Sequence, residues 1–471
     1  MLFVEFAFLP FFLTVLAVHW LLRSNTWRKA WLLAAGCYFY GCWDWRFLGL
    51  VAFSTLLDYV VALNLEQPGA RRKLWLSCTL AGNLGLLGFF KYFNFFLDSA
   101  VTFLDALGLQ AHRPTLAIIL PVGISFYTFQ TLSYTLEVYY GRLEARRSLL
   151  DFATFVSFFP QLVAGPIVRA KDFLPQLDEP RVWARVDVRA ALTLFLIGFL
   201  KKACVSDNLA PHVDRFFAAP TEFDALSAWI AVLAYAVQIY CDFSGYTDMA
   251  LACAALLGYE LCLNFARPYF ARNVADFWRR WHISLSTWLR DYLYVPMGGS
   301  RCARWKTYRN LMATMLLGGL WHGASWNFVI WGGLHGAALC ALRLWSESMP
   351  RAESARQSLA RTLLATAFTF VFVCFCWIFF RSPDLASALV TARSFVLLDA
   401  PGTQSLGAPL LAPLAALALL HGLAHSPWGG HLARSWRALP LWGFASAYGV
   451  AAALAMALVP ASSRPFIYFQ F

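Results

Sequence analysis

Leu317-Gly318-Gly319-Leu320-Trp321-His322-Gly323-Ala324-Ser325-Trp326 is the stretch that decides the fold of this chain. It lies inside the apolar run 311–345, which exceeds the ~20 residues that a helix needs to cross a bilayer. An imidazole buried there without partners is costly, so an ionisable residue at that depth is functional by default. We therefore predict that His322 belongs to a reaction centre within the membrane.

A second histidine, His282, lies upstream in Asp276-Phe277-Trp278-Arg279-Arg280-Trp281-His282-Ile283-Ser284-Leu285-Ser286, a segment too charged to span lipid. The ordinary pKa of an imidazole is near working pH, which suits a base that takes a proton from a hydroxyl. Serine-hydrolase elbows and Gly-rich nucleotide loops do not occur in the sequence, and neither histidine has zinc-ligand spacing. The pattern favours metal-free transfer of an activated group to a hydroxyl, with His322 as base.

The composition is that of a multi-pass membrane protein. Hydrophobic residues make up 60% of the chain and charged residues 14%, against about 25% in soluble proteins. The net charge of +12 arises from Lys and Arg in short loops, which indicates membrane topology and contact with anionic lipids rather than nucleic acid. The 11 cysteines are scattered, so we expect neither disulfides nor a metal site.

Apolar runs recur along the whole chain and predict an all-α bundle of about eleven or more transmembrane helices. After three in the first 65 residues, they lie at roughly 74–104, 116–140, 150–168, 187–205, 226–258, 311–345, 360–380, 385–398, 406–424 and 441–460. Runs that contain Pro, Gly and charge, such as 159–166, predict broken or re-entrant helices. We divide the chain into a core (1–380), additional helices (381–460) and an aromatic carboxy-terminal motif (461–471).

The amino terminus, residues 1–22, has no basic residue before its apolar stretch and predicts a retained helix rather than a signal peptide. Basic residues follow it at Arg28 and Lys29, the corner 44–46 is nearly uncharged, and 71–73 is basic again. Because cytoplasmic loops are enriched in Lys and Arg, this alternation places the amino terminus outside the cytoplasm.

The most basic stretch, 272–309, is expected to face the cytoplasm. Within it, Trp281, Ser284, Trp288 and Asp291 recur at three- and four-residue steps, which predicts one helix lying in the interface. Such a helix could serve only to contact lipid. Alternatively, its arginines hold the phosphates of an acyl donor. These arginines are Arg279, Arg280 and Arg290.

Two further groups of polar residues lie inside apolar runs. Asp242 and Ser244 begin a segment that ends at Asp248, and we expect them to support or orient an imidazole, to cap a helix break at Gly245, or to pair with an arginine. His335 follows His322 on the same run, and helical periodicity puts both on nearly the same face.

Several motifs together resemble the membrane-bound O-acyltransferase family over nearly the whole chain. They are Pro121-Val122-Gly123-Ile124-Ser125-Phe126-Tyr127, Ala164-Gly165-Pro166-Ile167-Val168-Arg169, Asp242-Phe243-Ser244-Gly245-Tyr246, Asn264-Phe265, the segment 277–294 and Trp321-His322-Gly323. The bacterial branch of the family acetylates alginate, cellulose and other exopolysaccharides, or transfers D-alanine to teichoic acid.

The resemblance implies re-entrant and interfacial helices around a central tunnel, with His322 at its centre and His282 near its cytoplasmic mouth. The donor would be acetyl-coenzyme A or an acylated carrier protein on the cytoplasmic side of the bacterial inner membrane, with no tightly bound cofactor. The product would be an acetylated secreted exopolysaccharide of the alginate or cellulose type, completed by periplasmic acetyltransferase or polysaccharide-modification subunits.

The residues that we expect to contact the substrates lie around the two histidines. They are Trp278, Arg279, Arg280, Trp281, Ser284, Ser286, Arg290, Asp291, Trp321 and Ser325. Ser325 is a departure from the family pattern, because relatives often have Asn there, and the departure bears on hydrogen bonding around His322.

The chain ends in Pro465-Phe466-Ile467-Tyr468-Phe469-Gln470-Phe471. In the teichoic-acid system a separate peptide ends in a similar aromatic motif whose tyrosine resembles an acyl relay, so Tyr468 is a candidate relay here. The alternative is an aromatic anchor at the membrane interface.

Two other functions fit parts of the pattern. A transporter or channel component could use His282, His322 and Asp242 as a relay, without covalent transfer. A family member could also acylate a lipid or a protein instead of a polysaccharide.

Overall fold

The computed structural model describes residues 1–109, 116, 118–348, 358–407, 410–461, 464 and 466–467. Over these residues the chain is helical, and their one strand-like contact is an isolated bridge between Phe223 and Gln404. The predicted all-α fold is confirmed.

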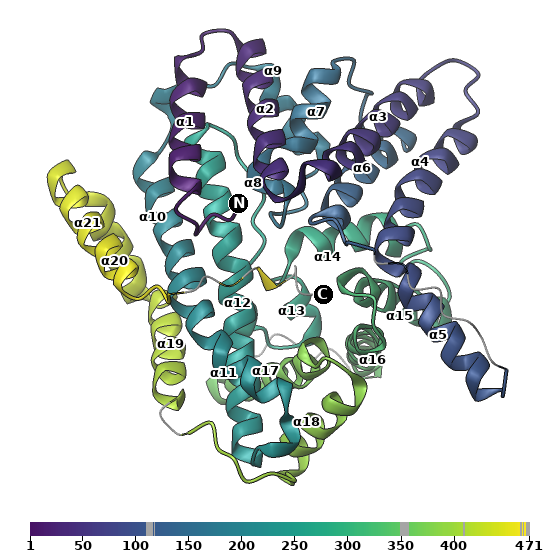
Figure 1. The fold of residues 1–471 in the computed structure, drawn as a ribbon, viewed down its shortest axis with the longest axis vertical. Coiled ribbons are helices and arrows are strands. Elements are labelled where there is room, and N and C mark those ends of the chain that lie inside the picture. The colour runs from purple at the N-terminus through teal and green to yellow at the C-terminus, as the bar shows by residue number, and fades with distance from the viewer. Residues whose placement is uncertain are drawn as a thin grey trace.

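The first part of the chain forms a group of helices in which α6 packs against α3 and α4 (Figure 1). Its helices are α1 (Phe8–Leu21), α2 (Asn25–Asp44), α3 (Leu48–Leu65), α4 (Arg72–Leu87), α5 (Phe93–Ala106) and α6 (Ile124–Tyr139). A short π-helical turn, η2 (Gly88–Tyr92), connects α4 to α5. This turn bears on the site, because it carries Lys91.

The middle of the chain is built around α12 (Ala225–Leu256), the longest helix in the described residues and one of the most buried. It packs against α10, α11 and α17. The other helices of this part are α7 (Leu149–Ser157), α8 (Phe159–Leu162), α9 (Ala170–Asp178), α10 (Val188–Phe199), the π turn η4 (Leu200–Ser206) and α11 (Asp207–Ala218).

The last part of the chain contains the two histidines and then a set of peripheral helices. It comprises α13 (Val274–Trp278), α14 (Ile283–Leu289), the π turn η7 (Arg290–Tyr294), α15 (Arg304–His322), α16 (Trp326–Ser348), α17 (Leu359–Arg381), α18 (Leu385–Leu397), α19 (Leu411–Ala424), α20 (Pro427–Ala438) and α21 (Leu441–Ala457). Figure 1 shows α19, α20 and α21 along one edge, away from α15 and α16.

Five helical segments among the described residues are long and apolar enough to cross a membrane: Asn25–Leu65, Arg72–Ala106, Ala225–Leu256, Trp326–Ser348 and Leu359–Arg381. Four shorter apolar helices accompany them: α1, α18, α19 and α21. The predicted number of crossings, about eleven or more, stays a prediction.

The surface and the interior have the polarity of a membrane protein. Large apolar side chains such as Leu364 and Phe368 are exposed, at 71% and 77%. Polar side chains such as Asp58 and Asn83 are buried and hydrogen-bond to each other. In water this surface would be unfavourable, whereas lipid tails match it.

Two sequence-based predictions about broken helices have opposite outcomes. The break expected within 159–166 is present, because the backbone is extended at Phe158, between α7 and α8, and α8 ends at Leu162. The break considered at Gly245 is absent, since α12 continues through it. Gly245 instead lets α10 approach closely: a Cβ there would lie 2.6 Å from the carbonyl oxygen of Gly198.

The single interfacial helix predicted across 276–292 is wrong. The segment forms two short helices, α13 and α14, separated by a turn at 279–282. Trp281 and Trp288, which the predicted helix would place on one face, are buried inside the protein. Of the residues at the three- and four-residue spacing, Ser284 and Trp288 lie on α14, Trp281 lies in the turn and Asp291 lies in η7.

Candidate functional site

Glycines at the contact between α15 and α16 determine where His322 lies. A Cβ on Gly319 would lie 2.2 Å from the carbonyl oxygen of Phe328, and one on Gly332 would lie 2.3 Å from that of Met315. Gly323 follows His322 with extended backbone, and a Cβ there would overlap the Phe328 ring at 2.1 Å. The two helices therefore form a tight hairpin, with His322 at the end of its first arm.

His322 is 4% exposed and lies among aromatic rings. Its ring centroid is 5.0 Å from that of Trp331, 5.2 Å from that of Phe380 and 6.3 Å from that of His282. The structure thus brings together the two histidines that the sequence singled out.

His282 begins α14 in the left-handed backbone region, with φ of 43°. Non-glycine residues rarely adopt this conformation, and it occurs preferentially at functional sites. Asn264 stabilises it: its backbone carbonyl accepts from the Ile283 N–H, and its Oδ1 accepts from the Ser284 N–H and Oγ–H.

The tautomer of His282 follows from the same contact. Asn264 Oδ1, an acceptor, lies 3.2 Å from His282 Nδ1, so Nδ1 carries the proton. The lone pair is then on Nε2. By accepting this hydrogen bond, Asn264 fixes the orientation of the His282 ring.

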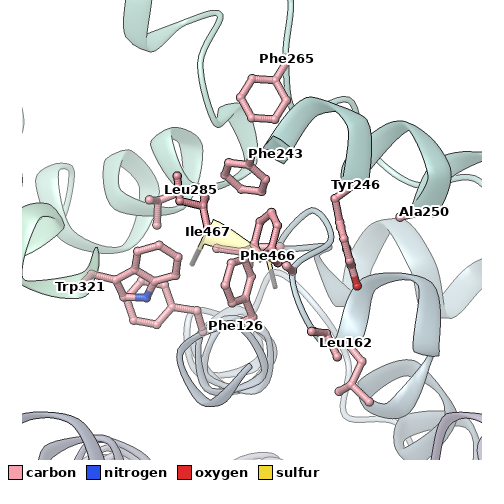
Figure 2. Packing of buried hydrophobic residues seen from close by; sticks show 14 of the residues in the cluster. Phe126, Leu162, Phe243, Tyr246, Ala250, Phe265, Leu285, Trp321, Phe466 and Ile467 are labelled. Atoms are coloured by element: carbon pink, nitrogen blue, oxygen red, sulfur yellow. The ribbon is translucent and has the colours of Figure 1, made fainter. Parts of the chain in front are cut away.

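A small cavity of about 40 Å³ adjoins His322 on one side. It is lined by Lys91, Ser125, Phe126, Trp321 and His322, among others. Figure 2 shows the Phe126 and Trp321 rings beside each other. A volume of this size accommodates a few water molecules or a hydroxyl-bearing group.

A larger cavity of about 760 Å³ lies along α14, α15 and α16. Three arginines, Arg279, Arg290 and Arg343, line it together with Trp278 and other residues. This cavity and the small one share no lining residue. Trp331 contacts a lining residue of each cavity, because its ring centroid is 5.7 Å from that of Trp278 and 5.0 Å from that of His322.

The residues expected to contact substrate fall into two groups. Trp278, Arg279, Ser286 and Arg290 line the larger cavity, and Trp321 lines the smaller one. The other group is engaged elsewhere: Arg280 pairs with Asp276 at 2.9 Å, Ser284 binds Asn264, Ser325 accepts from the Asn327 N–H, Trp281 is buried, and Asp291 is ion-paired.

Asp291 joins α9 to the edge of the larger cavity. It forms ion pairs with Arg169 at 2.6 Å and with Arg290 at 2.7 Å. Partial burial raises the pKa of this carboxyl, but the hydrogen bonds from Arg290 and Arg169 outweigh burial and hold it below its usual value. Asp291 is therefore charged at neutral pH and fixes Arg290 at the cavity wall.

Asp242 and Ser244 contact lysines rather than an imidazole or an arginine. Asp242 pairs with Lys202 at 2.6 Å, and Ser244 accepts a hydrogen bond from Lys201. Asp242 also accepts from the backbone N–H of Ile467 at 2.7 Å. Together, Asp242 and Lys202 fasten the carboxy-terminal tail inside the protein.

Phe466 and Ile467 are buried, and Figure 2 shows Phe466 among Phe126, Phe243 and Tyr246, with Ile467 on the side of Leu285. Phe466 contacts Phe243, whose ring centroid is 4.7 Å from that of His282. Tyr468 lies outside the described residues.

The sequence missed some residues of the site and misplaced another. Asn264 was part of a family motif without an assigned role, and Lys91, Trp331 and Arg343 were given no role. His335 was expected on one helix with His322, but the break at Gly323 puts it on α16. It accepts a hydrogen bond from Trp278 at 3.3 Å instead.

Residues 140–382 match the membrane-bound O-acyltransferase family. The chain belongs to this family. It is 42% identical to the probable alginate O-acetylase of Azotobacter vinelandii, over 81% of this chain and 74% of that protein. It is also 39% identical to the peptidoglycan O-acetyltransferase of Helicobacter pylori, over 83% of this chain and 78% of the relative.

A more distant relative is the teichoic acid D-alanyltransferase of Bacillus subtilis, which is 29% identical over 56% of this chain and 70% of its own length. The family and these relatives agree in reaction type, transfer of an acyl group to an oxygen. The chain is thus a multi-pass membrane O-acyltransferase of the acetyltransferase kind.

Proposed function

We propose that this protein passes an acetyl group from a cytoplasmic acyl thioester across the bacterial inner membrane, for O-acetylation of a secreted exopolysaccharide. The observation that carries the proposal is the position of His322, one aromatic residue away from an arginine-lined cavity and beside a small polar one. The acetylated polymers of the relatives, alginate and peptidoglycan, favour a polymer of the alginate type over cellulose.

The larger cavity suits the donor. Arg279, Arg290 and Arg343 can pair with phosphates of coenzyme A or of a phosphopantetheine carrier. Its apolar lining suits the thioester arm. Trp331 lies between this cavity and His322, so the acyl group would pass along this indole.

In the transfer step, His322 removes the proton from an acceptor hydroxyl as its oxygen attacks the thioester carbonyl. A C–O bond forms, the C–S bond breaks, and the thiolate leaves with the proton that the imidazole returns. His282, held by Asn264, lies close enough to orient the reacting groups. Tyr468, next to the buried Ile467, is the candidate acceptor that relays acetyl toward the outside.

The proposed orientation of the protein in the membrane is inferred from its basic loops. Lys29 pairs with Asp151 at 2.7 Å, Arg147 with Glu66 at 3.0 Å, and the Arg72 side chain donates to the backbone at Tyr139. The loops that contain these residues therefore gather at one end of the helices (Figure 1). By the positive-inside rule this end is cytoplasmic, which puts the amino terminus in the periplasm, where polysaccharide-modifying partners would receive the acetyl group.

The test uses purified protein in nanodiscs, incubated with radiolabelled acetyl-coenzyme A or acetylated carrier protein. We expect the wild-type protein to hydrolyse the donor or acquire label, and His322→Ala to do neither while inserting normally. His212→Ala, which removes an exposed histidine on α11, is the matched control. Substrate flux without any His322-dependent acyl chemistry would instead indicate a transporter.

The same labelling experiment tests the relay. The wild-type protein should carry acetyl on Tyr468, detected by mass spectrometry of the carboxy-terminal peptide. Tyr468→Phe should lose that label and its polymer acetylation in cells. If Tyr468→Phe cells acetylate polymer at the wild-type rate, the relay is refuted and the tail is an anchor only.

A further inference from the structure

Lys91 lies in the span Arg72–Ala106, where a lysine is costly and needs a compensating contact. It is half-buried and belongs to the π turn η2. Its Nζ donates to the carbonyl oxygens of Trp321 and His322, the latter at 3.2 Å, and to Ser125 Oγ at 3.3 Å. Three hydrogen bonds use all three protons of the ammonium group.

These carbonyls are the ones that α15 leaves without partners. The last four carbonyls of an α-helix accept no hydrogen bond from within the helix, and they form the negative end of its dipole. Tyr92, the next residue, donates from its hydroxyl to the carbonyl of Leu320 at 2.7 Å. The consecutive residues Lys91 and Tyr92 thus cap three successive carbonyls, those of residues 320–322.

We propose that Lys91 is a positioning residue, which fixes the imidazole of His322 by binding the end of the helix that carries it. This inference rests on the proposed role of His322 as the base. A direct role as the donor to an oxyanion is disfavoured, because all of its protons are engaged by protein oxygens. A positively charged donor stabilises the carboxyl end of α15 more than a neutral donor would, because this end is the negative pole of the helix dipole.

The placement also explains why the small cavity keeps its shape. Lys91 links three elements that line it: η2, α6 through Ser125, and α15 through Trp321 and His322. Without the ammonium group, the carbonyls of Trp321 and His322 would lose a buried partner, and the end of α15 would be held less firmly. A displacement of about 1 Å in a reacting group can lower a rate about 100-fold.

The test is steady-state kinetics of the full chain in nanodiscs, with acetyl-coenzyme A or acetylated carrier protein as donor. We expect Lys91→Met to lower kcat about 10- to 100-fold with little change in KM for the donor. Lys91→Arg, which keeps the cation and several donors, should recover part of the loss, and Tyr92→Phe should cost less than Lys91→Met. Lys171→Met, which removes an exposed lysine on α9, is the matched control and should match wild type.

Unchanged kcat in a folded Lys91→Met protein overturns the inference, as does a loss confined to KM, which would make Lys91 a binding residue. If Lys91→Met does not elute as a folded protein, Lys91→Arg and Tyr92→Phe decide: wild-type kcat in both also overturns it. These results are distinct from failure of the proposed function, in which the wild-type protein itself turns over no thioester.

Discussion

His282 and Asn264 illustrate what sequence reasoning recovers at the scale of single residues. The sequence identified His322 because ionisable groups are rare in apolar surroundings, and His282 because the family resemblance places it near the mouth of the tunnel. It could not pair His282 with Asn264, because no local periodicity links a loop residue to a histidine in a left-handed turn. Arg343 escaped notice for a similar reason, since only the α15/α16 hairpin brings it beside Arg279 and Arg290.

Arg343 provides a prediction at this scale. Its guanidinium pairs with Glu347 at 2.7 Å and lines the larger cavity, where a donor phosphate would compete for it. Loss of one charge-assisted hydrogen bond should weaken donor binding about tenfold. We expect Arg343→Ala to raise KM for the donor by about that factor with kcat nearly unchanged. Arg301→Ala, an exposed arginine outside the cavity, should have no effect; equal KM values in both variants would contradict a donor site there.

At the scale of helices, the glycines of the α15/α16 hairpin were visible in the sequence only as flanks of His322. Their role depends on the partner helix: Gly332 lies tightly against the Met315 backbone of α15, whereas the neighbouring Gly333 has room for a Cβ beside the Leu316 side chain. Periodicity predicted the apolar runs well, because lipid and core both select apolar side chains. It failed for 276–292, where two short helices and a turn replace one helix.

Gly332 and Gly333 form a matched pair for a stability test. A Cβ at Gly332 would lie 2.3 Å from the Met315 carbonyl, whereas one at Gly333 would make an ordinary contact at 3.6 Å. We expect Gly332→Ala to lower the melting temperature, because overpacking costs about 1–3 kcal/mol, and to reduce turnover by moving α15. Gly333→Ala should be neutral or stabilising, since Ala favours helix by up to about 1 kcal/mol. Equal melting temperatures would show that the hairpin is looser than described.

At the scale of the whole molecule, the sequence predicted a helical membrane bundle but not which distant segments of the chain contact each other. The tail at Arg464 and Ile467 returns to α12 and η4, where Lys202 donates to the Arg464 carbonyl at 3.1 Å and Asp242 accepts from Ile467. Asp207 also pairs with Lys202, at 2.8 Å. Contacts between residues more than 200 positions apart leave no local trace in a sequence, so none of the three roles considered for Asp242 included the tail.

Hydrogen exchange can test this anchoring. Asp242→Asn removes the charge that pairs with Lys202, so the Ile467 amide should exchange at least about tenfold faster, equivalent to about 1.4 kcal/mol. Asp248→Asn is the control, because Asp248 lies on α12 like Asp242 and pairs with Lys201 of η4, and it has no hydrogen bond or ion pair with Arg464, Phe466 or Ile467, the described residues of the tail. Mass spectrometry of the carboxy-terminal peptide measures both. Equal protection in the two variants would mean that aromatic packing around Phe466 alone holds the tail.

The proposed transfer requires the larger cavity to open toward the cytoplasm and the smaller one toward the periplasm, and the indole of Trp331 contacts one residue that lines each of them. A continuous file of water through such an enzyme would discharge the proton gradient of the cell. A single indole blocks such a file of water and still leaves only a short distance for the acetyl group to cross. Vesicles that contain the protein should therefore hold a pH difference as well as empty ones, and Trp331→Ala should make them leak.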